Sequence, residues 1–357
     1  MRKAIIIVLG GLLALGCQKD VRKDTPEDGF PIYLSAITQK SIETRAPYEL
    51  TTPDETEGGI LHSEVWASSA DGAYLDNGWN GKNNGSAVAI HSYADFNSGE
   101  PQLLNTAVYP QSGTPVHFVG LHPQGNWNVS DDGTKASYTF DGSQDVMFAA
   151  KITGTYADPN AEDLIFDVPV LRFLHLLTWM KVKMIAEDED TAKAWGKIKE
   201  MKITSQNNVA IALNKDYSFD NCVTFSSDNG GLIPLHKKGS NDIFPDTGGY
   251  QLQYYPQSDA PAEVAYVLCS PVIADDIEIE NGTEVTVPEY TIHIETERRK
   301  ISLPIDLRIS ESRYFTGSTR SRCFTINLIF KMGNAIVVSA EVEDWILGGR
   351  GSVDIVE

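Results

Sequence analysis

The sequence predicts an all-β fold built from two β-sandwiches in tandem, with one short helix. Short runs of alternating polar and apolar residues recur along most of the chain. Asp-Gly and Asn-Gly pairs separate several of these runs, and such pairs favour tight turns because glycine adopts positive φ and the Asx side chain bonds to the nearby backbone. The length of 357 residues is typical of two domains.

The first 17 residues have the features of an export signal. A basic pair, Arg2 and Lys3, precedes an apolar run over residues 4–15, which is too short to span a bilayer as a helix. A small residue before Cys17 resembles a bacterial lipobox, which implies cleavage before Cys17 and lipid on its thiol. An ordinary signal peptide that contains a cysteine is the alternative. The polar residues that follow resemble a tether.

The first strand is expected directly after this tether. Its residues alternate between two faces, with one set comprising Ile32, Leu34 and Ala36 and the other Tyr33, Ser35 and Ile37. A polar, extended run containing Arg45-Ala46 follows, and a protease that cleaves after arginine needs an exposed segment of this kind. Cleavage there would remove the strand, so residues 18–45 are predicted to be a tether and a removable first strand.

The rest of the chain divides into two expected domains, residues 46–166 and 167–357. Residues 163–185 are almost continuously apolar, which predicts two long strands near the boundary. The acidic run at residues 187–190 leads into the only plausible helix of the mature chain, over residues 191–199, whose acidic start and lysine-containing end match the helix dipole. Strands return after residue 201, and residues 323–330 and 335–342 form the clearest hairpin.

Composition excludes several functions. The formal net charge of −20 argues against nucleic acid or anionic lipid as partners. After Cys17, an odd number of cysteines remains, namely Cys222, Cys269 and Cys323, so a complete disulfide framework is impossible. Buried thiols are expected, and one bridge plus one thiol is the alternative.

No catalytic constellation, cofactor site or metal site is predicted. The seven histidines show no zinc-ligand spacing, and His117 and His122 fall on opposite faces of a strand. His175, within an apolar run, is expected to be a hydrogen-bonded core residue. A pair of carboxylates for glycoside hydrolysis is defined in space and stays open. Several aromatic residues are candidates for stacking on sugars, although most are expected to pack in the core: Tyr74, Trp79, Tyr93, Phe96 and Trp127.

Taken together, five stretches of the chain resemble fimbrillins, the subunits of type V fimbriae. They are the lipobox ending at Cys17, Thr44-Arg45-Ala46, residues 145–149, residues 170–175, and the closing hairpin from Phe324 to Trp345. The resemblance covers the whole chain and depends on the order and spacing of these stretches.

The resemblance implies two transthyretin-like (Ig-like) β-sandwich domains, no enzymatic activity, and export as a lipoprotein to the outer membrane. It also implies that a trypsin-like, Arg-specific protease cleaves between Arg45 and Ala46 and removes the strand at residues 32–37. A neighbouring subunit then donates a strand from its C-terminal region, here within residues 335–356. Burying each large apolar side chain of such a strand contributes on the order of 1.5–3 kcal/mol. The partners would be other fimbrial subunits, and the location a cell-surface fimbrium.

Two other classes of function compete with a pilus shaft or tip subunit. One is a non-polymerising outer-membrane lipoprotein that binds glycans through loop aromatics. The other is a β-sandwich glycosidase.

Overall fold

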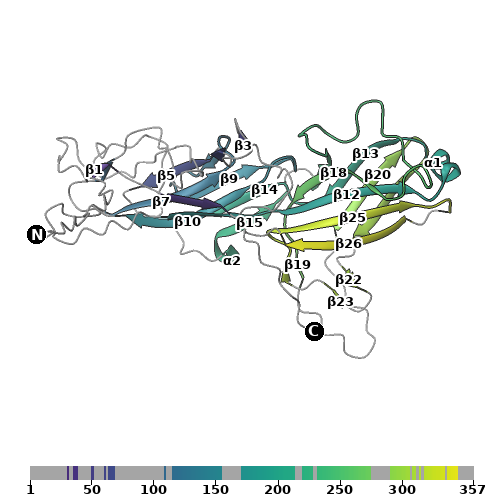
Figure 1. Ribbon diagram of the computed structural model, residues 1–357. Helices are drawn as coiled ribbons and strands as arrows, with labels where there is room; N and C mark the ends of the chain where they lie inside the picture. Colours follow the sequence, from purple (N-terminus) through teal and green to yellow (C-terminus); the bar gives the residue numbers. More distant parts are fainter. Residues whose placement is uncertain are drawn as a thin grey trace, which may run out of the picture.

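The computed structural model describes residues 30–31, 35–38, 50–51, 60–61, 63–68, 108–109, 115–154, 170–213, 219–227, 231–274, 290–305, 308–310, 313–314, 317–333 and 336–344. Figure 1 shows two lobes placed end to end, with early strands at the left and late strands at the right. Each lobe contains two larger β-sheets. The protein is therefore all-β, as the sequence predicts.

The first sandwich combines a five-stranded and a four-stranded sheet. The five-stranded sheet has the order β2 (Ser35–Thr38), β11 (Val170–His175), β10 (Met147–Gly154), β7 (Val116–His122) and β5 (Glu64–Ser68). The four-stranded sheet has the order β15 (Val223–Ser226), β14 (Asn208–Ala212), β9 (Lys135–Thr139) and β8 (Asn128–Val129).

The second sandwich has the same sheet sizes. Its five-stranded sheet has the order β17 (His236–Lys237), β18 (Ala262–Cys269), β12 (Thr178–Ala186), β25 (Arg322–Phe330) and β26 (Ile336–Asp344). Its four-stranded sheet has the order β16 (Leu232–Pro234), β13 (Ile198–Thr204), β20 (Tyr290–Thr296) and β21 (Lys300–Ile305). The hairpin of β25 and β26 pairs from Arg322 opposite Asp344 to Phe330 opposite Ile336, which confirms the predicted closing hairpin.

Four two-stranded sheets complete the strands of the described residues. They are β1 (Phe30–Pro31) with β6 (Val108–Tyr109), β3 (Leu50–Thr51) with β4 (Ile60–Leu61), β19 (Ile273–Ala274) with β24 (Gly317–Ser318), and β22 (Arg308–Ser310) with β23 (Arg313–Tyr314).

The predicted helix is present but lies earlier than expected. It is α1 (Glu189–Trp195), and its N-cap Asp188 accepts a hydrogen bond of 2.7 Å from the Thr191 amide. This bond also lowers the pKa of Asp188. The helix ends at Gly196, whose φ of 71° breaks the helical geometry, and residues 198 and 199 already belong to strand β13. A single turn, α2 (Phe219–Cys222), was not predicted. Neither helix has the length and apolar composition needed to cross a membrane, among the residues the structure describes.

The two sandwiches interleave in sequence, which corrects the contiguous domains expected at residues 46–166 and 167–357. Strands β11, β14 and β15 follow residue 166, yet they pair with strands of the first sandwich. The reason is that β11 and β12 form an almost continuous run, so the chain enters the second sandwich and then returns through β14 and β15. Domain limits drawn from the local sequence alone miss this return.

One apolar core cluster extends through both sandwiches. It includes Trp66 and Val119 from the first sandwich and Phe324 and Ile326 from the second. At the join, the Leu268 amide donates to the Gly142 carbonyl at 2.9 Å, and a Cβ at residue 142 would lie 2.8 Å from Val267 Cγ2. The two sandwiches therefore share a continuous apolar core.

Cys222, Cys269 and Cys323 are buried thiols. Cys269 and Cys323 lie on the two strands that flank β12, opposite Thr178 and Trp179. Two strand spacings separate their backbones by about 9.5 Å, which exceeds the reach of a disulfide, about 7 Å. Burial raises the pKa of the Cys269 thiol, so it is chemically inert at neutral pH.

Candidate strand-acceptor site

Residues 35–37 of the predicted first strand belong to β2, at the edge of the first sandwich. Strand β2 is the outermost strand of its sheet and pairs in parallel with β11, with Ser35, Ala36 and Ile37 opposite Val170, Leu171 and Arg172. Thr38 extends the strand by one residue and lies opposite Phe173. Residues 32–34, and the predicted sites Cys17, Arg45 and Ala46, lie outside the described residues.

The two residues that precede the expected strand take a different partner from β2. Phe30 and Pro31 form β1 and pair with Tyr109 and Val108 of β6. The N-terminal segment therefore joins the first sandwich at two separate places. The alternation at residues 32–37 gave no indication of this division, because the partner β6 is far away in sequence.

Strand β6 lies against the outer face of the five-stranded sheet. The Tyr109 ring packs edge-on against Phe118, with ring centroids 6.4 Å apart, and a Cβ at Gly154 would lie 2.3 Å from the Tyr109 hydroxyl. Burial raises the pKa of Tyr109, which keeps its hydroxyl neutral. Because β1 pairs with β6, loss of β1 would leave β6 without this pairing partner.

The outer face of this sheet is a second apolar core, separate from the core between the sheets. Successive residues of each strand point to opposite sides of the sheet. Trp66, Val119 and Phe148 face the main core, and the residues next to them in sequence belong to the outer core. The outer cluster consists of Val65, Ala67, Val116, Phe118, Met147, Ala149, Leu171 and Phe173. Strand β11, which pairs with β2, contributes Leu171 and Phe173, so its edge is apolar on this side.

One row of residues runs from β2 across the whole sheet. Thr38 lies opposite Phe173, Phe173 opposite Ala149, Ala149 opposite Gly120, and Gly120 opposite Val65. A Cβ at Gly120 would lie only 2.3 Å from the Phe173 ring. Glycine at residue 120 therefore leaves space for the large ring of Phe173, which lies on β11, the strand that pairs with β2. A glycine inside a strand pattern is a sequence signal of such close approach.

The far end of β11 is anchored by buried polar groups. His175 contacts Asp145 through its Nδ1 atom, and both side chains are fully buried. Ser321 Oγ donates to the His175 carbonyl at 2.7 Å, and the Leu176 amide donates to the Val146 carbonyl at 2.9 Å. This confirms His175 as a hydrogen-bonded core residue. With β10 on its other side, β11 is held in place by contacts that do not involve β2.

The described aromatic candidate for sugar stacking is a core residue instead. Trp127 is 9% exposed, its Nε1 donates to the Pro123 carbonyl at 2.8 Å, and its ring lies 5.1 Å from that of Tyr138. The other candidates, Tyr74, Trp79, Tyr93 and Phe96, lie outside the described residues.

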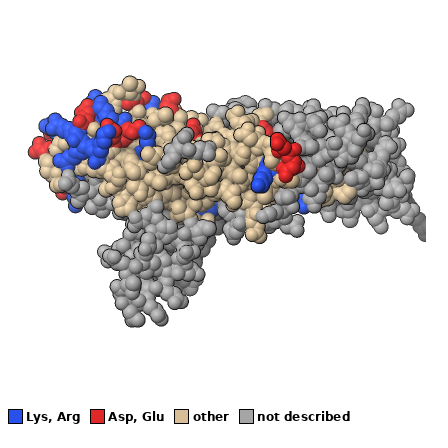
Figure 2. Space-filling view, turned by 180° about the vertical axis from the view of Figure 1, so that it is seen from behind, with Lys and Arg blue, Asp and Glu red and all other residues tan. Residues whose placement is uncertain are grey.

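Charged side chains gather at the end of the second sandwich, seen at the left of Figure 2. Many are ion-paired there: Lys193 with Glu189 at 2.7 Å, Lys199 with Glu297 at 3.2 Å, and Lys300 with Glu295 at 2.7 Å. Exposed pairs of this kind stabilise a fold little, and their opposite charges largely cancel. This end of the molecule is a mixed surface and not a basic patch.

No protein-family model and no curated protein matches the chain. A solved structure described as a candidate cell adhesion protein from Bacteroides uniformis shares 15% identity with a TM-score of 0.50, over 90% of this chain and 99% of that one. Another, from Bacteroides ovatus, shares 14% identity with a TM-score of 0.45, over 89% and 99%. A candidate adhesin from Bacteroides ovatus shares 10% identity with a TM-score of 0.42, over 93% and 98%. The first of these likenesses shows a common fold.

Proposed function

We propose that this protein is a structural subunit of cell-surface fimbriae, a shaft or tip subunit that supports adhesion. In this proposal the chain is exported as an outer-membrane lipoprotein through Cys17 and cleaved after Arg45 by a trypsin-like, Arg-specific protease. The observation that carries the proposal is β2, a four-residue edge strand on an acceptor that is anchored without it. The adhesive role is taken from the description of the Bacteroides uniformis structure of the same fold.

Removal of β2 would make β11 the new edge of the sheet. Its backbone groups would then be available for another strand, and Leu171 and Phe173 would flank the vacated position. An incoming strand regains these contacts by β-augmentation. Because each subunit accepts one strand and donates another, the contact is head-to-tail and produces a filament.

The lengths of the edge ladders support a donor segment that lies after β26. Strand β2 has four register pairs with β11, whereas β26 has nine with β25. With about 1 kcal/mol net per backbone hydrogen bond, releasing β26 would cost roughly twice what filling the β2 position returns. We therefore place the donor after β26, at residues 345–356 within the expected 335–356. These residues lie outside the described part of the chain.

Cleavage of the purified full chain tests the proposal. An Arg-specific protease should give a product that begins at Ala46, identified by mass spectrometry, and this product should form ladders that resist mild denaturant. Arg45→Ala should prevent the ladders. Arg22→Ala is the matched control, because Arg22 precedes the strand and its loss should leave assembly unchanged. An excess of a peptide spanning residues 30–38 should block assembly by refilling the acceptor.

A product that is cleaved cleanly after Arg45 and stays monomeric would contradict the proposal. The non-polymerising lipoprotein that binds glycans would then be the better interpretation, and a glycan array would test it.

A further inference from the structure

The sheet edge next to β17 is covered only in part by β17 itself. Strand β18 pairs with β12 at seven register positions, whereas β17 pairs with β18 at only two, opposite Tyr266 and Ala265. One more contact follows, in which the Lys238 amide donates to the Val264 carbonyl at 3.1 Å. Towards its C-terminal end, β18 therefore extends beyond the strand that pairs with it.

A turn of the first sandwich completes this edge. The turn comprises residues 141–143, between β9 and β10, and its Gly142 carbonyl accepts a hydrogen bond of 2.9 Å from the Leu268 amide. Gly142 has a φ of 90°, and a Cβ at this residue would lie 2.8 Å from Val267 Cγ2. Glycine is therefore required here, since it adopts positive φ and allows this close approach. The first sandwich thus supplies a backbone partner that β17 does not provide.

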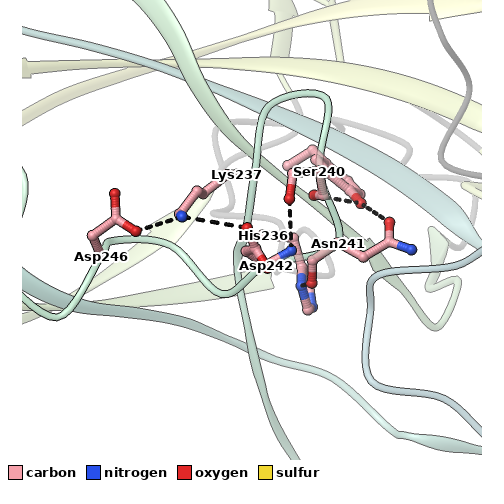
Figure 3. A network of polar contacts seen from close by, with 7 residues as sticks. His236, Lys237, Ser240, Asn241, Asp242 and Asp246 are labelled. Atoms are coloured by element: carbon pink, nitrogen blue, oxygen red, sulfur yellow. Dashed lines mark hydrogen bonds and ion pairs between the residues drawn. The ribbon is translucent and has the colours of Figure 1, made fainter.

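A loop of the second sandwich, residues 236–246, begins with β17 and is held together by its own polar contacts, which Figure 3 shows. Lys237 is paired with Asp246 and lies 3.5 Å from Asp242. The Lys237 amide donates to the Asp242 carbonyl at 2.8 Å, and the Asp242 amide donates to Ser240 Oγ at 3.1 Å. These contacts fold the loop back on itself, so it can support the turn as a formed unit.

Tyr266 on β18 connects this loop to the turn. Its hydroxyl lies 2.9 Å from the Ser143 carbonyl of the turn, and 3.2 Å and 3.1 Å from the Ser240 carbonyl and Asn241 Oδ1 of the loop. A phenol hydroxyl has one proton to donate, so acceptors from both sandwiches share this donor. Burial, together with the nearby Asp141 charge, raises the pKa of Tyr266 to about 12, so the donor keeps its proton at neutral pH.

Strand β18 has the composition of a strand that pairs readily with other chains. Its eight residues include one charged residue, Glu263, and neither proline nor glycine, and residues 265–269 are at most 5% exposed. Segments of this kind aggregate when they lie open at a sheet edge. The edge strand β21 differs, because it carries Lys300 and Pro304, and proline has no amide for a further ladder. The β18 edge therefore depends on the turn and the loop for its protection.

We propose that the 141–143 turn, pinned to the 236–246 loop by Tyr266, closes the β18 edge to incoming strands and so confines strand addition to β11. This inference rests on the proposed function, because a subunit that assembles by strand addition has to keep its other long edges closed. Without the Tyr266 hydroxyl, the turn and the loop would separate and the Leu268 amide would lose its acceptor. The open edge would then pair with the β18 edge of a second copy, since antiparallel edge pairing joins two copies symmetrically.

The test compares uncleaved full-length proteins that all carry Arg45→Ala, by size-exclusion chromatography with light scattering. Adding Tyr266→Phe should produce dimers or larger species whose share increases with protein concentration, whereas the background protein should stay monomeric. Tyr250→Phe is the matched control, because Tyr250 packs against Phe244 of the same loop and its hydroxyl forms no hydrogen bond within the described part of the chain. A Tyr266→Phe protein that associates no more than this control would overturn the proposal.

Amide hydrogen exchange of the same proteins locates the contact. At low concentration, the Leu268 amide of Tyr266→Phe should exchange about fivefold faster than in the control, the effect of one lost hydrogen bond. When the protein associates, the amides of β18 should become protected again, while the loop and the turn continue to exchange quickly. Association that leaves the exchange of the loop and the turn as in the control would overturn the proposal, because it would arise at another surface.

Gly142→Ala opens the same contact from the side of the turn and provides the test if Tyr266→Phe fails to fold. Its Cβ would press against Val267, so this variant should also associate, whereas Gly248→Ala, whose Cβ meets nothing within 4 Å, should not. The two proposals fail in different ways. The fimbrial proposal fails if the cleaved wild type stays monomeric, and this inference fails if the opened variants of the uncleaved protein associate no more than their controls.

Discussion

A methyl group added at residue 120 tests how β2 and its acceptor depend on the core beneath them. In Gly120→Ala, the new Cβ would lie 2.3 Å from Phe173 Cζ, 2.9 Å from Phe173 Cε1 and 3.0 Å from Ala149 Cβ. Carbon atoms in contact are normally about 3.5–4.0 Å apart, so the ring must move by about 1 Å. Phe173 is 1% exposed, so its ring is enclosed by neighbouring side chains.

Overpacking of a dense core usually costs about 1–3 kcal/mol, and this contact belongs at the upper end because ring atoms and Ala149 are both too close. We therefore expect Gly120→Ala to lower the free energy of unfolding by about 3 kcal/mol, measured by urea unfolding of the full chain. Because Thr38 lies opposite Phe173, amide hydrogen exchange in β2 should also become faster. Gly248→Ala is the control, since a Cβ there meets nothing within 4 Å.

A second substitution tests whether the loss of stability in Gly120→Ala is caused by the close contact with the Phe173 ring. Phe173→Leu shortens the ring side chain, so it should cost less in the Gly120→Ala background than in the wild type. Gly120→Ala with the same urea midpoint as Gly248→Ala would refute the close-packing argument.

Two further predictions concern buried polar groups and thiols. Asp145→Asn leaves His175 without its carboxylate partner in a fully buried site, so the free energy of unfolding should fall by about 3–5 kcal/mol. A urea midpoint within error of the wild type would contradict the proposed contribution of this pair to stability. A thiol reagent should modify the three buried cysteines, Cys222, Cys269 and Cys323, only after unfolding, as counted by mass spectrometry. Rapid labelling of the native protein, or fewer than three labelled thiols among them after unfolding without reductant, would contradict their placement as buried thiols.

Local patterns predicted the features that depend on neighbouring residues. The closing hairpin followed from two alternating runs around a short turn, and the apolar run at residues 163–185 did contain two strands, β11 and β12. His175 was identified as a core residue because apolar residues surround it in sequence. Each of these features is determined by residues close together in the chain.

The sequence did not predict which distant segments of the chain pair with each other. Nothing in residues 208–226 indicates that β14 and β15 return to the first sandwich, since β14 pairs with β9, which begins at Lys135, and β15 pairs with β14. The division of the N-terminal segment between β1 and β2 has the same cause. A run of alternating residues predicts a strand and its faces but does not identify the neighbour that completes its ladder.

Gly120 was not identified in the sequence analysis, although the sequence contained a signal for it. Gly120 interrupts an alternating run, and an internal glycine of this kind indicates close packing.

The nearly unbroken path from β11 into β12 has a mechanical consequence for a filament of such subunits. Tension applied at the acceptor strand passes directly along covalent bonds into the second sandwich, without crossing a flexible linker. There, β12 lies beside β25 over eight consecutive register pairs, from Trp179 opposite Cys323 to Ala186 opposite Phe330. In the proposed filament, a pull along these parallel strands would load their hydrogen bonds together in shear.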